Sequence, residues 1–301
     1  MKKNLLIIGG TGFIGKNLIL KFKSKNYRLF SLSKNFDRKV LPKKNINYIK
    51  CDITKRKEIE KKLKKINFNY IVNLGGYIDH KKKIKTIASH FYGVKNLVNY
   101  FKKKKIDLFI QVGTSLEYGN IKSPQSENNY KKTKSFYGTA KRNASKYIVN
   151  TNKKEDFPYI ILRLYQVYGP YQNELRLLPF IIKACLDNKN FGVTSGNQLR
   201  DFLYVDDLIN LIKKIIQSNV KNQIFNVGYG KPIKVKKIIH KINSMIKKGN
   251  PEYGKIKMRK DESLNLYPSI KKVKKYFNWK PRIELDNGLR KTIYYFKKLI
   301  K

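Results

Sequence analysis

A glycine-rich segment near the amino terminus constrains the fold more than any other feature of the sequence. An apolar run at residues 5–8 precedes it, and residues 11–25 continue with a helical period. The segment reads Ile8-Gly9-Gly10-Thr11-Gly12-Phe13-Ile14-Gly15. Glycines at this spacing permit a sharp turn, a close approach to a diphosphate and tight packing of helix on strand, while the helix amino terminus offers amide donors. The pattern alone is a weak signal, but its place between a strand and a helix predicts a dinucleotide-binding loop.

Apolar runs alternate with helical segments along the first half of the chain. The runs cover residues 5–8, 27–33, 46–51, 70–74, 108–112 and 159–164. The helical segments cover residues 11–25, 57–66, 84–101 and 136–149. This alternation is typical of strands joined by helical crossovers in a parallel sheet. We therefore predict an α/β fold built on a Rossmann-type, doubly wound parallel sheet.

The rhythm changes after Gly169-Pro170. Further helices are predicted over residues 175–186, 205–217, 235–246 and 285–299, and a further strand over residues 223–227. We expect two domains. Residues 1–170, with residues 201–230 returning to them, form the dinucleotide-binding domain, and residues 171–200 and 231–301 form a smaller substrate-binding domain.

The chain is strongly basic. Lysine and arginine total 68 against 20 aspartates and glutamates, a formal net charge of +48. Such an excess can indicate nucleic acid or an anionic membrane as partner. The lysines are spread through every segment, however, and no helix-turn-helix, zinc-finger or aromatic RNA-binding signature accompanies them. We expect solvated surface lysines and no dedicated nucleic-acid or membrane partner.

Cysteine and histidine usage argues against a disulfide framework or a metal site. Cys51 and Cys185 lie far apart, which favours a reduced, cytoplasmic protein. The three histidines, His80, His90 and His240, lack the spacing of metal ligands. No run of about 18 apolar residues, the length needed to cross a membrane, occurs in the sequence.

The end of the second predicted strand bears on cofactor choice. An acid at this place accepts from the adenosine 2′-hydroxyl and repels a 2′-phosphate. Ser33 and Lys34 stand there instead, so we expect NADP(H) to be preferred, with NAD left open because Lys34 could be one more solvated lysine. Asp52 and Ile53, after the third strand, are placed to meet the adenine, although Asp52 could also cap a helix.

A phenol and an ammonium lie four residues apart at the start of a predicted helix. Tyr137 and Lys141 therefore share one helix face, and a cation at that distance lowers the pKa of a phenol. The strand at residues 108–112 leads into Thr114, which presents a hydroxyl at the carboxyl edge of the sheet, where open α/β sheets bind ligands. Tyr137 is therefore a candidate for proton transfer, with Lys141 as the cation beside it and Thr114 at the edge where a ligand would bind.

Several motifs together resemble the extended short-chain dehydrogenase/reductase family, the NAD(P)-dependent nucleotide-sugar epimerases, dehydratases and reductases. The resemblance covers nearly the whole chain. It rests on the glycine loop, the segment 114–119, Tyr137 with Lys141, Arg163 with Val167-Tyr168-Gly169-Pro170, Arg200-Asp201-Phe202-Leu203-Tyr204-Val205-Asp206-Asp207, Phe225-Asn226-Val227-Gly228 and Trp279-Lys280-Pro281.

The resemblance implies roles for individual residues. Thr114 matches the residue that hydrogen-bonds the sugar oxygen in this family. Tyr137 matches the acid/base. Lys141 matches the residue that lowers the tyrosine pKa and holds the nicotinamide ribose. The expected cofactor-binding residues are Gly9, Gly12, Phe13, Ile14, Gly15, Ser33, Lys34, Asp52, Ile53, Leu74, Gly75 and Lys141. The expected substrate-binding residues, which include the diphosphate-binding Arg200, are Thr114, Ser115, Arg200, Arg259 and Glu262.

Two departures from the family pattern stand out. Ser115-Leu116 occupy the places of the Asp-Glu pair that performs elimination in 4,6-dehydratases, and His90 stands where an asparagine is common. After the fourth strand, His80 either faces the cleft or has a structural role.

The sequence therefore favours an NADPH-dependent reductase acting at C4 of a nucleotide-linked 4-keto-6-deoxyhexose. An NAD-dependent nucleotide-sugar 4-epimerase is the alternative, ahead of a 4,6-dehydratase or a non-enzymatic NADP-sensing or RNA-binding module. The substrate partner is then a nucleotide-diphosphate sugar. The family resemblance also implies a homodimer formed through the helices at residues 84–101 and 136–149.

Overall fold

The chain divides into two compact units. The computed structural model describes residues 2–22, 26–35, 46–258 and 262–300. The first unit comprises Met1–Asn120, Tyr130–Leu164 and Ile212–Phe225, and the second comprises Ile121–Asn129, Tyr165–Leu211 and Asn226–Lys301. The domain bounds expected from the sequence differ from these units at residues 121–129, 165–170, 201–211 and 226–230, and they stay a prediction.

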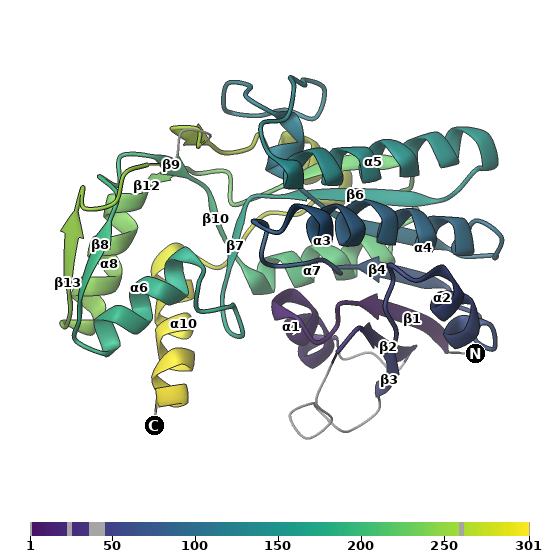
Figure 1. Ribbon diagram of the computed structural model, residues 1–301, viewed down its shortest axis with the longest axis horizontal. Helices are drawn as coiled ribbons and strands as arrows, with labels where there is room; N and C mark the ends of the chain where they lie inside the picture. Colours follow the sequence, from purple (N-terminus) through teal and green to yellow (C-terminus); the bar gives the residue numbers. More distant parts are fainter. Residues whose placement is uncertain (1, 23–25, 36–45, 259–261, 301) are drawn as a thin grey trace. The chain divides into compact units, whose positions relative to one another are not determined.

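A sheet of seven strands forms the centre of the first unit (Figure 1). Its order is β11-β6-β5-β4-β1-β2-β3, and the pairs from β6 to β3 are parallel. The strands are β1 (Lys3–Ile8), β2 (Tyr27–Ser33), β3 (Ile46–Lys50), β4 (Tyr70–Asn73), β5 (Leu108–Thr114), β6 (Tyr159–Leu164) and β11 (Gln223–Val227). The chain moves outward from β1 in both directions, which confirms the predicted doubly wound fold and places the ligand-binding switch point beside β1.

The first unit has helices α2 (Arg56–Leu63), α4 (Gly93–Phe101) and α5 (Phe136–Glu155) packed in a row along the sheet. Helix α4 contacts both α2 and α5, and α5 also contacts β5 and β6 (Figure 1). The unit also contains α1 (Phe13–Lys21) and α3 (Lys83–Ile87). Helix α4 buries Val94, Leu97, Val98 and Phe101, which lie on one face at helical spacing.

The single helix predicted over residues 84–101 is interrupted in the structure. A π-helical turn, η2 (Ala88–Tyr92), separates α3 from α4. The wider turn inserts one extra residue, and such turns occur mostly at functional sites. His90 lies within this turn and is buried.

The second unit contains short strands and helices. Its strands are β7 (Gln166–Tyr168), β8 (Asn190–Val193), β9 (Leu199–Arg200), β10 (Phe202–Tyr204), β12 (Ile233–Lys234), β13 (Asn250–Tyr253) and β14 (Asn265–Leu266). Its helices are α6 (Leu177–Leu186), α8 (Val235–Ile246), α9 (Lys271–Phe277) and α10 (Leu285–Ile300). Helix α7 (Val205–Ile216) begins in this unit and ends in the first. Helices α6, α8 and α10 contact one another.

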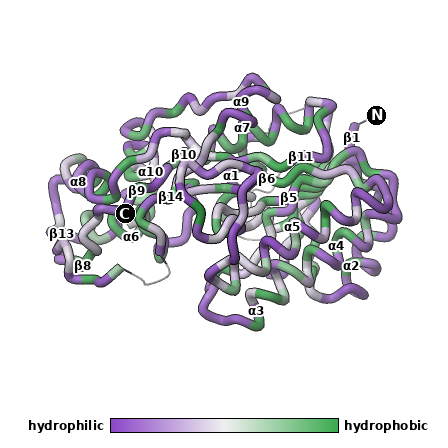
Figure 2. The backbone as a smooth tube through the Cα atoms, turned by 90° about the horizontal axis from the view of Figure 1, so that it is seen from above, coloured by the Kyte–Doolittle hydropathy of each residue, from purple (hydrophilic) through white to green (hydrophobic). Residues whose placement is uncertain are grey.

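Burial follows from the layered arrangement of the first unit. Every residue of β4 and β6 is buried, as expected for central strands of a parallel sheet covered on both faces. Figure 2 colours most of β5 and β6 in the green of hydrophobic residues. Cys51 and Cys185 are buried free thiols. Among the described residues, no helix is long and apolar enough to cross a membrane.

Candidate active site

The glycine loop connects β1 to α1. Gly9 has a φ of +76°, a left-handed conformation that favours glycine. A Cβ on Gly15 would collide with the Gly9 carbonyl oxygen and the Gly10 backbone, so this glycine permits the helix to pack on the loop. Gly12 caps α1 with no side-chain hydrogen bond, and no acidic residue lies in the first turn of this described helix. The amides at this helix start therefore suit a diphosphate.

A second loop meets the glycine loop at the switch point. A Cβ on Gly9 would lie 3.0 Å from the Cα of Gly75, which follows Leu74 at the end of β4. The Gly75 amide donates to the Asn73 side chain at 3.1 Å. Ile53 packs near Gly75, so the ends of β1, β3 and β4 meet here. Glycine at position 9 therefore lets the two loops approach closely, at the edge of the sheet where the dinucleotide is expected.

The ends of β2 and β3 carry the residues expected at the adenosine. The Thr11 hydroxyl donates to Ser33 Oγ at 2.9 Å. Lys34 Nζ lies 2.8 Å from Asp52 Oδ2, and the lysine side chain is 68% exposed. Burial acts to raise the pKa of Asp52, but hydrogen bonds from Lys34 and Thr54 outweigh it, and the pKa is lowered. Asp52 accepts hydrogen bonds from both the amide and the hydroxyl of Thr54, so it also has a local structural role. It is not the helix cap considered from the sequence, because the N-cap of α2 is Lys55.

The three candidate catalytic residues, Thr114, Tyr137 and Lys141, lie on β5 and α5. Thr114 ends β5 and is 8% exposed, and its Oγ1 accepts from the Leu116 amide at 3.4 Å. Tyr137 is half-buried in the first turn of α5, and Lys141 follows one turn later. A Cβ on Gly138 would lie 2.8 Å from the Leu116 carbonyl oxygen, so the start of α5 packs closely against the segment after Thr114.

Lys141 is buried beneath the carboxyl edge of the sheet. Its ammonium donates to the Val112 carbonyl oxygen at 2.8 Å, and the residue is 4% exposed. Burial lowers the pKa of Lys141 to about 8, while the charge of Glu117 opposes this shift. The ammonium form therefore still dominates at neutral pH and can stabilise a phenolate on the same helix face.

Two histidines pack against Tyr137. The His80 ring stacks on the phenol with centroids 3.8 Å apart and planes 11° apart, and the His90 ring meets it edge-on at 4.9 Å. Burial and the Lys141 charge lower the pKa of His90 to about 3. His90 Nε2 lies 3.0 Å from the Tyr77 carbonyl oxygen, while Nδ1 is buried without a hydrogen-bond partner among the described residues.

Little in the sequence indicates this aromatic cluster. From the sequence, His90 is only a departure from a common asparagine, and His80 either faces the cleft or has a structural role. The structure brings both rings onto Tyr137. No local pattern could have shown this, because His80 lies in a loop and His90 in a π-helical turn.

Glu117 is the carboxylate nearest in sequence to Thr114, and it is wholly buried. It accepts hydrogen bonds from the Thr114 amide, the Ser145 hydroxyl and Arg163 Nε. Its oxygens are thus occupied within the fold. Leu116, which stands where dehydratases have a catalytic acid, is 41% exposed and has no proton to transfer.

The expected substrate-binding residues of the second unit include an ion pair. Arg200 Nη2 lies 2.5 Å from Glu262 Oε1, and Nη1 donates to the carbonyl oxygens of Leu199 and Leu264 at 2.8 and 3.1 Å. The pair fixes the guanidinium beside β9. Arg259 lies outside the described residues.

Other motif residues of the second unit hold its loops. Asp201 accepts from the amides of Tyr229 and Gly230 at 2.5 and 2.6 Å, and burial raises the pKa of its carboxyl to about 6. The indole of Trp279 donates to the Asp207 carbonyl oxygen at 3.2 Å. These residues are therefore structural.

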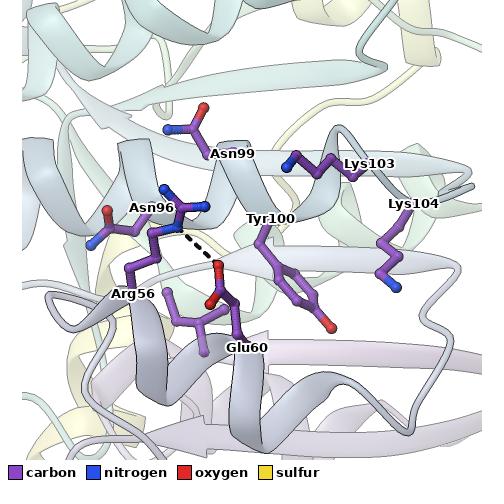
Figure 3. A pocket seen from close by; sticks show the side chains of 8 residues that line it. Arg56, Glu60, Asn96, Asn99, Tyr100, Lys103 and Lys104 are labelled. Carbon is purple, nitrogen blue, oxygen red and sulfur yellow. Dashed lines mark hydrogen bonds and ion pairs between the residues drawn. The ribbon is translucent and has the colours of Figure 1, made fainter.

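A surface pocket lies away from the candidate residues, between α2 and α4 (Figure 3). Arg56 and Glu60 lie one turn apart on α2 at the pocket wall, and Arg56 Nε is 2.9 Å from Glu60 Oε1. The lining residues are Arg56, Ile59, Glu60, Asn96, Asn99, Tyr100, Lys103 and Lys104. None of the residues expected to bind cofactor or substrate lines this pocket. Among the described residues, no cluster of His, Cys, Asp or Glu could hold a metal ion.

A doubly wound sheet with a glycine loop at its switch point, and threonine, tyrosine and lysine near its carboxyl edge, defines a dinucleotide-dependent enzyme of the short-chain dehydrogenase type. Comparison with known families agrees. Residues 5–228 match the profile of the NAD dependent epimerase/dehydratase family. The chain belongs to this family, whose members are enzymes of the extended short-chain dehydrogenase/reductase type.

Several known proteins are similar over nearly their full length. A putative UDP-glucose 4-epimerase of Methanocaldococcus jannaschii is 29% identical, over 97% of this chain and 98% of that protein. The crystal structure of a UDP-glucose 4-epimerase from Thermotoga maritima, with UDP-glucose, has a TM-score of 0.92 at 23% identity and covers 99% of this chain and 100% of that one. A dTDP-glucose 4,6-dehydratase from Bacillus anthracis in complex with NAD has a TM-score of 0.88 at 22% identity, covering 98% and 97%.

Proposed function

We propose that this enzyme uses NADPH to reduce C4 of a nucleotide-linked 4-keto-6-deoxyhexose. The observation that carries the cofactor choice is the end of β2, where Ser33 and Lys34 stand in place of a carboxylate. A lysine 68% exposed at this edge can meet a 2′-phosphate. NADPH, unlike a permanently held NAD, suits a net reduction.

The cofactor would be held along the carboxyl edge of the first unit. Gly9, Gly12 and Gly15 shape the loop, and the amides at the start of α1, including those of Phe13 and Ile14, would bind the diphosphate. Asp52 and Ile53 would border the adenine, Leu74 and Gly75 the middle of the cofactor, and Lys141 the nicotinamide ribose. When bound, the reduced nicotinamide supplies the hydride.

Proton transfer is assigned to Tyr137. Its phenol would donate a proton to the oxygen on C4 as that oxygen gains charge. Lys141, buried on the same helix face, would stabilise the phenolate form of Tyr137. Thr114 Oγ1 accepts from the Leu116 amide, which orients its hydroxyl proton to donate to the same sugar oxygen.

The nucleotide-diphosphate part of the substrate is assigned to the second unit. Arg200 is pre-positioned by Glu262 and two carbonyl oxygens, and a planar guanidinium suits phosphate oxygens. Arg259 and Glu262 are proposed to contribute to the same binding, and Ser115 to the sugar.

The test is stoichiometric. The purified protein is incubated with NADPH or NADH and nucleotide-linked 4-keto-6-deoxyhexoses, and loss of reduced nicotinamide is compared with the appearance of the 4-hydroxy sugar. One equivalent of NADPH consumed per product supports the proposal. Product formation without consumption of cofactor contradicts it.

An NAD-dependent nucleotide-sugar 4-epimerase is the second candidate, and the M. jannaschii relative favours it. An epimerase would interconvert two 4-hydroxy sugar nucleotides with no added cofactor and would release NAD on denaturation. A 4,6-dehydratase is less favoured because Leu116 lacks a transferable proton and Glu117 is engaged in the fold.

A homodimer is proposed to form through the helical segments α3 to α5. Large apolar side chains are exposed there: Ile84 is 83% exposed, Phe136 54% and Tyr92 53%. A second copy of the same face would remove them from water. Light scattering of the wild type and of an Ile84→Asp variant tests this, with a monomeric wild type as the contradicting result.

A further inference from the structure

The Glu117 carboxylate links three elements behind the proposed catalytic residues. Glu117 lies in the 3-10 turn η3 (Ser115–Tyr118), directly after β5. Oε1 accepts from the Thr114 amide at 2.9 Å. Oε2 accepts from the Ser145 hydroxyl at 2.7 Å and from Arg163 Nε at 3.0 Å. Glu117 thereby ties β5 to α5 and β6 at one buried point.

The contact with Thr114 fixes the backbone that carries the reactive hydroxyl. Thr114 is the N-cap of η3, with φ −149° and ψ 151°, and the Glu117 side chain completes a capping box with it. Gly113 makes room for the carboxylate, since a Cβ there would collide with Glu117 Oε1. The direction of Thr114 Oγ1 therefore depends on Glu117.

Glu117 also acts on the charge of Lys141. Ser145, which donates to Glu117, follows Lys141 by one helical turn and lies on the same face of α5. Burial lowers the pKa of Lys141 to about 8, and the carboxylate counteracts it. Without this anion, the buried amine would lose its proton at a lower pH.

The other groups around Lys141 do not replace this anion. From η2, His90 stays neutral because burial and the Lys141 charge lower its pKa to about 3. From β5, Val112 offers only a carbonyl oxygen. On α5 itself, Tyr137 is the phenol that the ammonium is proposed to serve, and from β6 Arg163 brings a positive charge.

We propose that Glu117 is a positioning residue of the active site, which orients Thr114 through its backbone and keeps Lys141 in the charged form. The roles of Thr114 and Lys141 in catalysis rest on the proposed function. The effect of Glu117 on the Lys141 proton does not, so the two can be tested separately.

The test removes the charge of Glu117 while keeping its shape. Glu117→Gln retains an oxygen for the Thr114 amide. We expect the Lys141 ammonium to titrate lower by on the order of one pH unit, because an opposite charge nearby is lost. NMR of isotope-labelled lysine, with the Lys141 signal identified by Lys141→Arg, measures this directly. The alkaline limb of kcat should move by a similar amount, with little change in KM.

Matched controls separate charge from structure. Ser145→Ala removes one hydrogen bond to Glu117 and no charge, so the Lys141 titration should stay as in the wild type. If Glu117→Gln does not fold, Glu117→Gln with Arg163→Met removes both charges of the buried pair. The Lys141 titration should then fall by less than in the single variant, because the lost Arg163 charge acts in the opposite direction.

An unchanged Lys141 titration in a folded variant lacking the Glu117 charge would overturn the proposal. A wild-type protein that does not oxidise NADPH would instead count against the proposed function. The NMR titration would then still decide whether Glu117 controls the Lys141 proton.

Discussion

Each unit contains an arginine paired with a glutamate, and the two pairs differ in burial. In the first unit, the side chains of Arg163 and Glu117 are 2% and 0% exposed. In the second, those of Arg200 and Glu262 are 5% and 23% exposed. The Glu117 carboxylate accepts hydrogen bonds only from groups inside the fold among those described, whereas the Glu262 carboxylate reaches the surface. One pair is therefore part of the frame behind the proposed catalytic residues, and the other is exposed enough to meet a ligand.

This contrast predicts that changes in the first unit alter turnover or stability, and changes in the second alter substrate binding. The largest expected effect is that of Tyr137→Phe. Loss of the phenolic proton should lower kcat by about 10²–10⁴-fold, while the affinity for NADPH stays nearly the same. Steady-state kinetics and calorimetric cofactor titration measure the two quantities. A variant with near-normal turnover would refute the role of Tyr137.

Breaking the buried pair should mainly affect stability. Arg163→Met leaves the Glu117 charge buried without its partner, which costs about 3–5 kcal/mol of unfolding free energy. Urea denaturation measures the loss. Arg200→Met is the matched control in the second unit, and it should cost clearly less because Glu262 reaches water. Equal losses would remove the distinction between the pairs.

The first unit should also show a pH-dependent stability that depends on His90. Its folded pKa of about 3 lies below the ordinary histidine value of about 6.5, so the unfolded chain binds the extra proton between these values. Stability should therefore fall as pH drops from about 6.5 toward 3, by up to about 1.4 kcal/mol per pH unit. Denaturation of wild type and His90→Asn across this range checks it.

The exposed His240 on α8 of the second unit offers the control. His240→Asn should keep the wild-type pH dependence of stability. If His90→Asn also keeps it, then the buried imidazole does not contribute as described.

Changing the second pair should affect binding and not turnover. Arg200→Lys retains a charge but loses the planar fork, so KM for the nucleotide sugar should rise about tenfold, which corresponds to about 1.4 kcal/mol. The kcat value should change little. A large fall in kcat with unchanged KM would place Arg200 in the chemistry instead.

The smallest effect is expected at the end of β2. Lys34→Asp should weaken NADPH binding and shift the preference toward NAD, because a carboxylate repels the 2′-phosphate. Lys55→Asp is a matched control, since Lys55 is 66% exposed and likewise paired with a carboxylate. Calorimetric titration measures the affinity of each protein for NADPH and for NAD. If the wild type binds NAD at least tenfold more tightly than NADPH, the proposed cofactor is contradicted.

Local sequence patterns were sufficient for much of the fold. The glycine loop and the alternation of apolar runs with helical segments depend on neighbouring residues, so the strands of the parallel sheet could be predicted. The short strands β8 and β13 and helix α9 could not, because they carry too few residues for a period to show. The break between α3 and α4 was also missed, since a π-helical turn leaves little trace in an apolar pattern.

The sequence by itself determined which residues stand at the strand ends and which share one face of a helix, and this was enough to select Thr114, Tyr137 and Lys141 as candidates. Only the tertiary structure decided what surrounds them. Glu117 and Arg163 are 46 positions apart in the chain, and His80 and Tyr137 come from a loop and a helix. Contacts between such distant residues depend on how the sheet and helices pack, which no local period encodes.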